Sequence, residues 1–176
     1  MQGWPVEGYL EAAHPLQRAM ADAVSAALRV EAPDQAVDGC GMLTFHAPLA
    51  ALASAFGRLA AGGLDAPGSR VAAAMRTHPG LVAYPGAIDT ELMTATPVIA
   101  KIGAEGVIAI GCEDGRGVAV KVADGALRAL DPAAVWAAGE LLGLPVGAGR
   151  LPALSAPEVR NSRDEVVGRL SVVASS

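Results

Sequence analysis

The hydrophobic pattern of this chain changes its period once, near Pro97, and this change limits the fold more than any other feature. Before Pro97, apolar residues recur every three or four positions, which is the period of amphipathic helices. After Pro97, runs rich in Val and Ile are separated by Gly, which is typical of short strands joined by turns. Helices that come first and strands that come later predict an α+β fold with an antiparallel sheet.

Four helices are expected in the first part of the chain. Pro15 and Pro48 stand where proline favours the first turn of a helix, and the pair Gly62 and Gly63 would end the second helix. Asp89 or Thr90 is the expected N-cap of the fourth helix, because short polar side chains accept hydrogen bonds from free N–H groups there. The expected helices cover residues 14–30, 48–61, 69–77 and 89–95.

The second part of the chain should form the sheet and one flanking helix. The sequence EDGRG at residues 113–117 is a hairpin connection between two apolar runs. Residues 132–142 predict a C-terminal helix, and the Gly- and Pro-rich residues 144–165 predict a loop. The expected strands cover residues 98–101, 107–111, 118–122 and 166–174.

Charge and length exclude several classes of function. The formal net charge is −5 and 18% of the 176 residues are charged, without a basic cluster, so we expect no nucleic-acid partner. No apolar run reaches the roughly 20 residues that span a bilayer, and the N-terminus lacks the basic and apolar regions of a secretion signal. We therefore expect no membrane partner and a cytoplasmic location. From the length of 176 residues we expect a single domain over residues 1–176.

The two cysteines, Cys40 and Cys112, do not make a disulfide framework in a chain of this size, and neither belongs to a C-x-x-C pair. We expect both thiols to be reduced. Cys112 ends a predicted strand and is expected to pack in the core. His14 precedes Pro15 at the start of the first helix, where it is expected to cap or pack.

Lys101 is one of only two lysines and lies inside a run of strand-forming residues. An unpaired buried ammonium costs on the order of several kcal/mol, so this side chain must reach water or an anion. The simplest interpretation is that Lys101 points to the solvent face of an edge strand. The sequence Lys-Ile-Gly on a strand also resembles the Lys-x-Gly element of the serine β-lactamase and glutaminase superfamily. In that superfamily the lysine faces the active-site cleft and supports the binding of anionic substrates.

Five collinear stretches resemble consecutive blocks of the L-asparaginase II family, the amidohydrolases typified by thermolabile rhizobial enzymes. The resemblance extends over nearly the whole chain but covers only the C-terminal half of the family. It implies half of a serine β-lactamase or glutaminase-type fold and hydrolysis of L-asparagine to L-aspartate and ammonia. The stretches are EGYLEAAHPLQRAM, VDGCGMLTFHAPLAALASAFGRLA, AMRTHPGLVAYPGAIDTELM, AKIGAEGVIAIG and GVAVKVADGALRALDPAAVWAAGELLGL.

The resemblance implies roles for three residues. Asp38 matches a polar active-site residue, Lys101 matches the cleft lysine, and we expect the Lys101 ammonium within reach of Asp38. Cys40 matches a metal-site cysteine, but a zinc site needs three or four donors. No cofactor is required on this interpretation, and zinc would bind only if an N-terminal half supplied further ligands. Otherwise Cys40 is expected to be a small buried hydrophobe, and nearby His46 is expected to be exposed or to add a polar group.

The nucleophile of the family is expected to lie outside this chain. Family members carry a Ser-x-x-Lys element in the half that precedes the matching blocks. Here the only lysines are Lys101 and Lys121, and neither stands three residues after a serine. Acyl transfer from an amide needs an activated nucleophile, so we expect this chain to supply a wall of the cleft but no nucleophile.

A sheet without its N-terminal strands would expose open edges. We therefore expect a homo-oligomer, or pairing with a separate N-terminal half, and a small amide amino acid as the substrate. The alternative function is a non-catalytic remnant of the fold that binds a small molecule or self-associates. A neighbouring reading frame that encodes the Ser-x-x-Lys half would favour the enzyme, and an isolated gene would favour the remnant.

Overall fold

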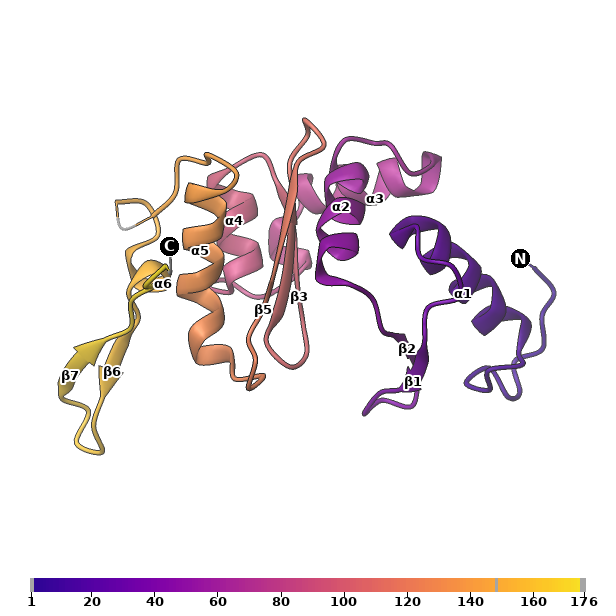
Figure 1. The fold of residues 1–176 in the computed structure, drawn as a ribbon, viewed down its shortest axis with the longest axis horizontal. Coiled ribbons are helices and arrows are strands. Elements are labelled where there is room, and N and C mark those ends of the chain that lie inside the picture. The colour runs from indigo at the N-terminus through magenta and orange to yellow at the C-terminus, as the bar shows by residue number, and fades with distance from the viewer. Residues whose placement is uncertain (1, 148, 175–176) are drawn as a thin grey trace. The chain divides into compact units, whose positions relative to one another are not determined.

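The structure is a computed structural model that describes residues 2–147 and 149–174 (Figure 1). Its contacts divide the chain into two compact units, Met1–Leu52 and Ala53–Ser176, which are described separately. Helices and antiparallel sheets are both present, so the predicted α+β class is confirmed. That residues 1–176 fold as one domain stays a prediction.

The first unit contains helix α1 (Pro15–Leu28), which begins at the predicted proline. His14 is its N-cap, and the Nδ1 atom of His14 accepts a hydrogen bond from the Leu16 N–H at 3.1 Å. The other ring nitrogen lies 3.0 Å from the carbonyl oxygen of Pro5. The buried imidazole therefore caps the helix, as predicted, and also bonds the segment that precedes it.

A short hairpin follows α1 in the first unit. Strands β1 (Gln35–Val37) and β2 (Leu43–Phe45) pair antiparallel, with Val37 opposite Leu43. The sequence analysis missed both strands, because three residues are too few to show an alternating pattern. The five residues 38–42 between them form the turn that carries Asp38 and Cys40.

In the second unit, a three-stranded antiparallel sheet lies between helices (Figure 1). The strands are β3 (Ile99–Gly103), β4 (Val107–Gly111) and β5 (Gly117–Lys121), each within two residues of its prediction. Their order in the sheet is β3-β4-β5, so β3 is an edge strand. Lys101 lies at the middle of β3, opposite Ala109 of β4.

Helices cover both faces of this sheet. Helices α4 and α5 bury Leu92 and Leu130 against Ile108 and Ile110 on one face, while α2 and α3 pack Ala60 and Ala72 against Ile99 on the other. Because both faces are covered, the apolar residues of β3 and β4 run continuously instead of alternating. The helical segments are α2 (Leu49–Ala60), α3 (Ala66–Thr77), η1 (Pro79–Leu81), α4 (Ile88–Ala95), η2 (Leu127–Ala129) and α5 (Leu130–Glu140).

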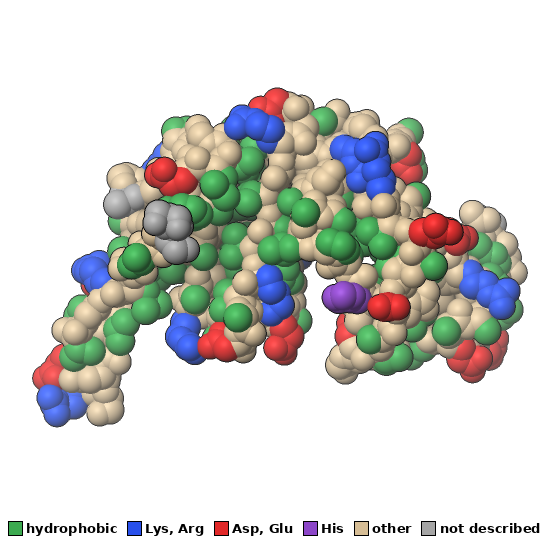
Figure 2. Space-filling view, in the orientation of Figure 1, with side chains coloured by type: hydrophobic (Ala, Val, Ile, Leu, Met, Phe, Trp, Pro, Cys, Tyr) green, Lys and Arg blue, Asp and Glu red, His purple; other side chains and the backbone are tan. Residues whose placement is uncertain are grey.

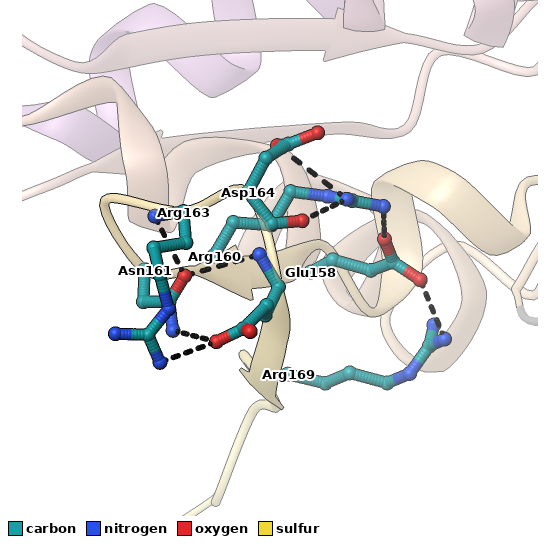
Figure 3. Close-up of polar contacts among 7 residues, drawn as sticks. Glu158, Arg160, Asn161, Arg163, Asp164 and Arg169 are labelled. Atoms are coloured by element: carbon teal, nitrogen blue, oxygen red, sulfur yellow. Dashed lines mark hydrogen bonds and ion pairs between the residues drawn. The ribbon is translucent and has the colours of Figure 1, made fainter.

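The C-terminal segment differs from the prediction. Residues 144–165, predicted as a loop, contain helix α6 (Pro152–Ser155) and strand β6 (Glu158–Arg160), and β7 (Val166–Arg169) ends before the predicted residue 174. The Oδ1 atom of Asn161 accepts hydrogen bonds from the N–H groups of Arg163 and Glu165 and closes the β6–β7 turn (Figure 3). Charged side chains dominate this hairpin, so hydrophobic periodicity could not reveal it.

An ion pair joins the two strands of this hairpin, and another lies within β6. Glu158 bonds Arg160 at 2.6 Å and, across the strands, Arg169 at 2.8 Å (Figure 3). In the space-filling view, acidic and basic side chains lie next to one another at the tip of this hairpin (Figure 2). All these partners are solvent-exposed or nearly so, and exposed ion pairs contribute little each. The hairpin is therefore held mainly by its turn and backbone pairing.

Cys112 and Cys40 are both free thiols, as predicted. Cys112 is buried among the core residues that pack on α4 and α5, which confirms its predicted packing role. Burial raises the pKa of the Cys112 thiol, so the thiol stays protonated near neutral pH. No helix in the described part of the chain combines the length and the apolar character needed to cross a membrane.

A pair of glycines lets helix α2 lie directly on the sheet. Gly111 of β4 and Gly117 of β5 are opposite each other in the sheet. A Cβ atom on Gly111 would overlap the carbonyl oxygen of Phe56, and one on Gly117 would overlap that of Ala53. Both obstacles are helix backbone atoms, which cannot rotate away as a side chain can. Close approach of a backbone is one reason for glycine inside a strand.

Replacing Gly111 with alanine should destabilise the second unit. The added methyl group must push α2 away from the sheet, and overpacking of this kind costs about 1–3 kcal/mol. Urea denaturation of Gly111→Ala and wild type measures the difference in the free energy of unfolding. Gly168→Ala is the matched control, because nothing lies within 4 Å of a Cβ atom at that strand position. Equal stability of Gly111→Ala and wild type would contradict the close packing of α2.

Candidate functional site

Lys101 reaches from strand β3 to a buried carboxylate. Its Nζ atom lies 3.2 Å from the Oδ2 atom of Asp89. The side chain of Asp89 is fully buried, whereas 45% of the Lys101 side chain is exposed. The sequence analysis required either water or an anion for this ammonium, and Lys101 has both. The ammonium is therefore paired on one side and open to solvent on the other.

Asp89 lies in the first turn of α4, beside the edge strand of the sheet. Its Oδ2 atom also accepts a hydrogen bond from the Ile102 N–H at 3.4 Å, and its Oδ1 atom accepts one from the Thr90 N–H at 3.1 Å. A carboxylate in the first turn of a helix also interacts favourably with the helix dipole. These contacts compensate the burial of the charge and connect the start of α4 to β3.

The prediction that Asp89 or Thr90 caps α4 is wrong. The N-cap is Ala87, and the carboxylate of Glu91 accepts a hydrogen bond from the Gly86 N–H at 2.9 Å. Because the sequence analysis gave Asp89 the role of a cap, it missed Asp89 as a partner of Lys101. The available signal was an acidic residue among the apolar residues of a short helix, close in sequence to the one lysine of a buried strand.

A second carboxyl group, that of Asp131, belongs to the same cluster. Asp131 lies in the first turn of α5 and is partly buried. Among the residues that the structure describes, none forms a hydrogen bond or ion pair with its carboxyl group. Burial raises the pKa of Asp131, and the negative charge of Asp89 raises this pKa further. The cluster thus contains one cation, one paired carboxylate and one carboxyl group that resists ionisation.

Replacing Asp131 with asparagine should change the pH dependence of stability. The raised pKa means that folding favours the protonated carboxyl group, so the cost of ionisation is absent below the unfolded-state pKa of about 3.9 and appears as the pH rises through the folded-state pKa. The free energy of unfolding of wild type should therefore fall relative to Asp131→Asn as the pH rises above the unfolded-state pKa. Urea denaturation at a series of pH values measures this difference.

Asp114 supplies a control of opposite sign. Hydrogen bonds from Arg116 lower the pKa of the exposed Asp114 carboxyl group, so its contribution to stability is present above the unfolded-state pKa and is lost as the pH falls. Wild type should gain stability relative to Asp114→Asn as the pH rises. A difference between wild type and Asp131→Asn that does not vary with pH would contradict the burial of the Asp131 carboxyl group near Asp89.

In the first unit, Asp38 and Cys40 lie in one turn between β1 and β2. The Oδ1 atom of Asp38 accepts hydrogen bonds from the N–H groups of Cys40 at 2.9 Å and Met42 at 3.3 Å, which is the geometry of an Asx turn. Hydrogen bonds from the Cys40 thiol and then from the Cys40 N–H lower the pKa of Asp38. Asp38 is exposed and is therefore an accessible, ionised carboxylate at neutral pH.

The expectation that Cys40 is a buried hydrophobe is wrong. Its side chain is exposed, because it lies in a five-residue turn at the end of a two-stranded sheet. His46 is exposed as well, which was the first of its two expected states. The described residues contain no group of three or more His, Cys, Asp or Glu side chains that would hold a metal ion. Asp38 and Cys40 alone do not fit a zinc site, which needs more donors.

Gln17 anchors this turn to helix α1. The side chain of Gln17 is fully buried, and its Nε2 atom donates a hydrogen bond to the carbonyl oxygen of Tyr9 at 2.7 Å. The same atom lies 3.9 Å from the Sδ atom of Met42, the last residue of the turn. Sequence reasoning missed Gln17, because a glutamine on an amphipathic helix is typical of the solvent face. Asp38 and Lys101 belong to different units, so their meeting in one cleft stays a prediction.

The family model of L-asparaginase II matches residues 1–172. The chain belongs to the L-asparaginase II family. The match spans both units, and it includes the Asp38–Cys40 turn, the Asp89 helix and the Lys101 strand. No curated protein sequence matches the chain. The resemblance that the five sequence blocks indicated is therefore confirmed at the level of the family.

Proposed function

We propose that this chain forms part of the site of a cytoplasmic L-asparaginase, which hydrolyses L-asparagine to L-aspartate and ammonia. Lys101 carries the proposal, because it is a cation on an edge strand that is paired on one side and exposed on the other. An ammonium group has three donors, and the bond to Asp89 uses one of them. The remaining donors would bind the α-carboxylate of the substrate.

Asp38 would act on the opposite charge of the same substrate. Free asparagine carries an α-ammonium group, and an exposed, ionised carboxylate is a suitable partner for it. The hydrogen bonds that hold Asp38 in its turn would keep the carboxylate in one orientation, which reduces the entropy lost on binding. Asp38 and Lys101 together would then select a zwitterionic amino acid over a simple amide.

The nucleophile in this proposal comes from a Ser-x-x-Lys element that residues 1–176 do not contain. The serine oxygen attacks the side-chain amide carbon, the C–N bond breaks, and the NH2 group takes up the serine proton and leaves as ammonia. Water then hydrolyses the acyl-enzyme ester and releases aspartate. The residues of this chain bind and orient the substrate during both steps.

Ammonia release from L-asparagine tests this function. We expect no turnover by the purified chain and measurable turnover when it is mixed with a separately expressed Ser-x-x-Lys half of a family member. Lys101→Ala should lower kcat/KM of the mixture by about 10- to 100-fold, since a hydrogen bond to a charged group contributes about 1.5–3 kcal/mol. L-glutamine in place of L-asparagine measures the preference for side-chain length.

Lys121→Ala is the matched control, because Lys121 is the other lysine of the chain and bonds the carbonyl oxygens of Glu105 and Val122 at a turn. It should leave kcat/KM unchanged. Turnover by the chain alone that disappears in Lys101→Ala or Cys40→Ala would contradict the assignment of the nucleophile. If both chains of the mixture are folded and no turnover is seen, the non-catalytic alternative is favoured, a remnant that binds a small molecule or self-associates.

We also propose that this chain is not a monomer. Strand β3 is an edge strand, and Val167 of the β6–β7 hairpin and Val173 beyond it are 61% and 89% exposed. Open strand edges and exposed apolar side chains favour self-association or pairing with the Ser-x-x-Lys half. Sedimentation velocity at micromolar concentration should therefore detect a dimer or a larger species. A stable monomer across that concentration range would contradict this proposal.

A further inference from the structure

The contacts of Asp89 exceed what a structural helix residue needs. The N-cap of α4 is Ala87, and only the Oδ1 atom of Asp89 serves this helix, through the Thr90 N–H. Its fully buried carboxylate instead bonds the Ile102 N–H on the strand and the Lys101 ammonium beside it. A buried carboxylate is costly compared with a neutral side chain of the same shape. At this cost, the Asp89 carboxylate bonds a cation that is itself open to solvent.

We propose that Asp89 is a positioning residue that holds the Lys101 ammonium at the edge of β3, in the place where Lys101 binds the anionic group of the substrate. We call the bond between Asp89 and Lys101 the clamp. The clamp rests on the geometry, whereas its role in binding the substrate rests on the proposed function. A lysine side chain has four rotatable bonds and samples many rotamers when it is free. The bond to Asp89 restricts Lys101 before a ligand arrives, which lowers the entropic cost of binding.

The charged groups around this clamp come from three elements. Asp89 is on α4, Lys101 is on β3, and Asp131 on α5 is close enough for the charge of Asp89 to affect it. Asp131 does not bond Lys101 in the described structure, so Asp89 is the residue that fixes the ammonium. Replacing Asp89 should therefore change the reactivity of the Lys101 amine, whereas replacing Asp131 should not change it directly.

The small number of lysines makes this effect measurable in the chain as it stands. Trace acetylation with acetic anhydride, read by mass spectrometry, reports the reactivity of Lys101 and Lys121 separately. Asp89→Asn keeps the size of the side chain and an acceptor for the Ile102 N–H, but it removes the negative charge. We expect Lys101 to react about two- to fivefold faster in Asp89→Asn, as for the loss of a half-exposed ion pair, with Lys121 unchanged.

Thr90→Val is the structural control. Thr90 is next to Asp89 in α4, and the change removes the hydrogen bond from its hydroxyl to the carbonyl oxygen of Pro79 in η1 without touching Lys101. It should leave the reactivity of both lysines unchanged. Equal reactivity of Lys101 in folded Asp89→Asn and in wild type would overturn the inference. Should Asp89→Asn not fold, 13C relaxation of the Lys101 ε-methylene in wild type decides, because mobility equal to that of free lysine would overturn the clamp.

Steady-state kinetics of the mixture with the Ser-x-x-Lys half separate this inference from the proposed function. Asp89→Asn should raise KM for L-asparagine about two- to tenfold, and its combination with Lys101→Ala should be no worse than Lys101→Ala alone, because the two residues act as a unit. A raised KM in Lys101→Ala with an unchanged KM in Asp89→Asn would overturn the positioning role. Absence of turnover in every mixture would overturn the proposed function, while acetylation of Lys101 would still decide the clamp.

Discussion

The ion pair between the buried carboxylate of Asp89 and the ammonium of Lys101 connects helix α4 to the edge strand β3 of the second unit. Burial of this charge is tolerated because the Lys101 ammonium and the N–H groups of Thr90 and Ile102 compensate it. The contacts with Lys101 and Ile102 connect the start of α4 to β3. The orientation of the Lys101 ammonium therefore depends on how α4 and β3 pack together.

The ion pair of Lys101 and Asp89 lies at the edge of a sheet whose faces are covered by helices. Helices cover both faces, and on one side Gly111 and Gly117 allow the backbone of α2 to contact the strands directly. Lys101 lies two residues along β3 from Ile99, which pairs with Gly111, and 45% of its side chain is exposed. Its ammonium reaches Asp89 of α4 beside this edge strand.

Local sequence patterns were sufficient for the regular elements that are long or apolar. The three strands of the main sheet and the five longer helices agree with periodicity, proline positions and glycine stops. Strands β1, β2 and β6 were missed, since each has only three residues and the β6–β7 hairpin depends on a polar turn at Asn161. Short elements stabilised by side-chain hydrogen bonds leave little periodic signal.

By itself, the sequence determined the α+β class, the family and three candidate residues, Asp38, Cys40 and Lys101, because these follow from local periodicity and collinear motifs. Only the tertiary structure decided that Cys40 is exposed and that the partner of Lys101 is Asp89, twelve residues earlier in the chain. The physical reason is that an ion pair forms where packing brings two segments together. The packing of α4 against β3 is a property of the whole core, which no short stretch of sequence contains.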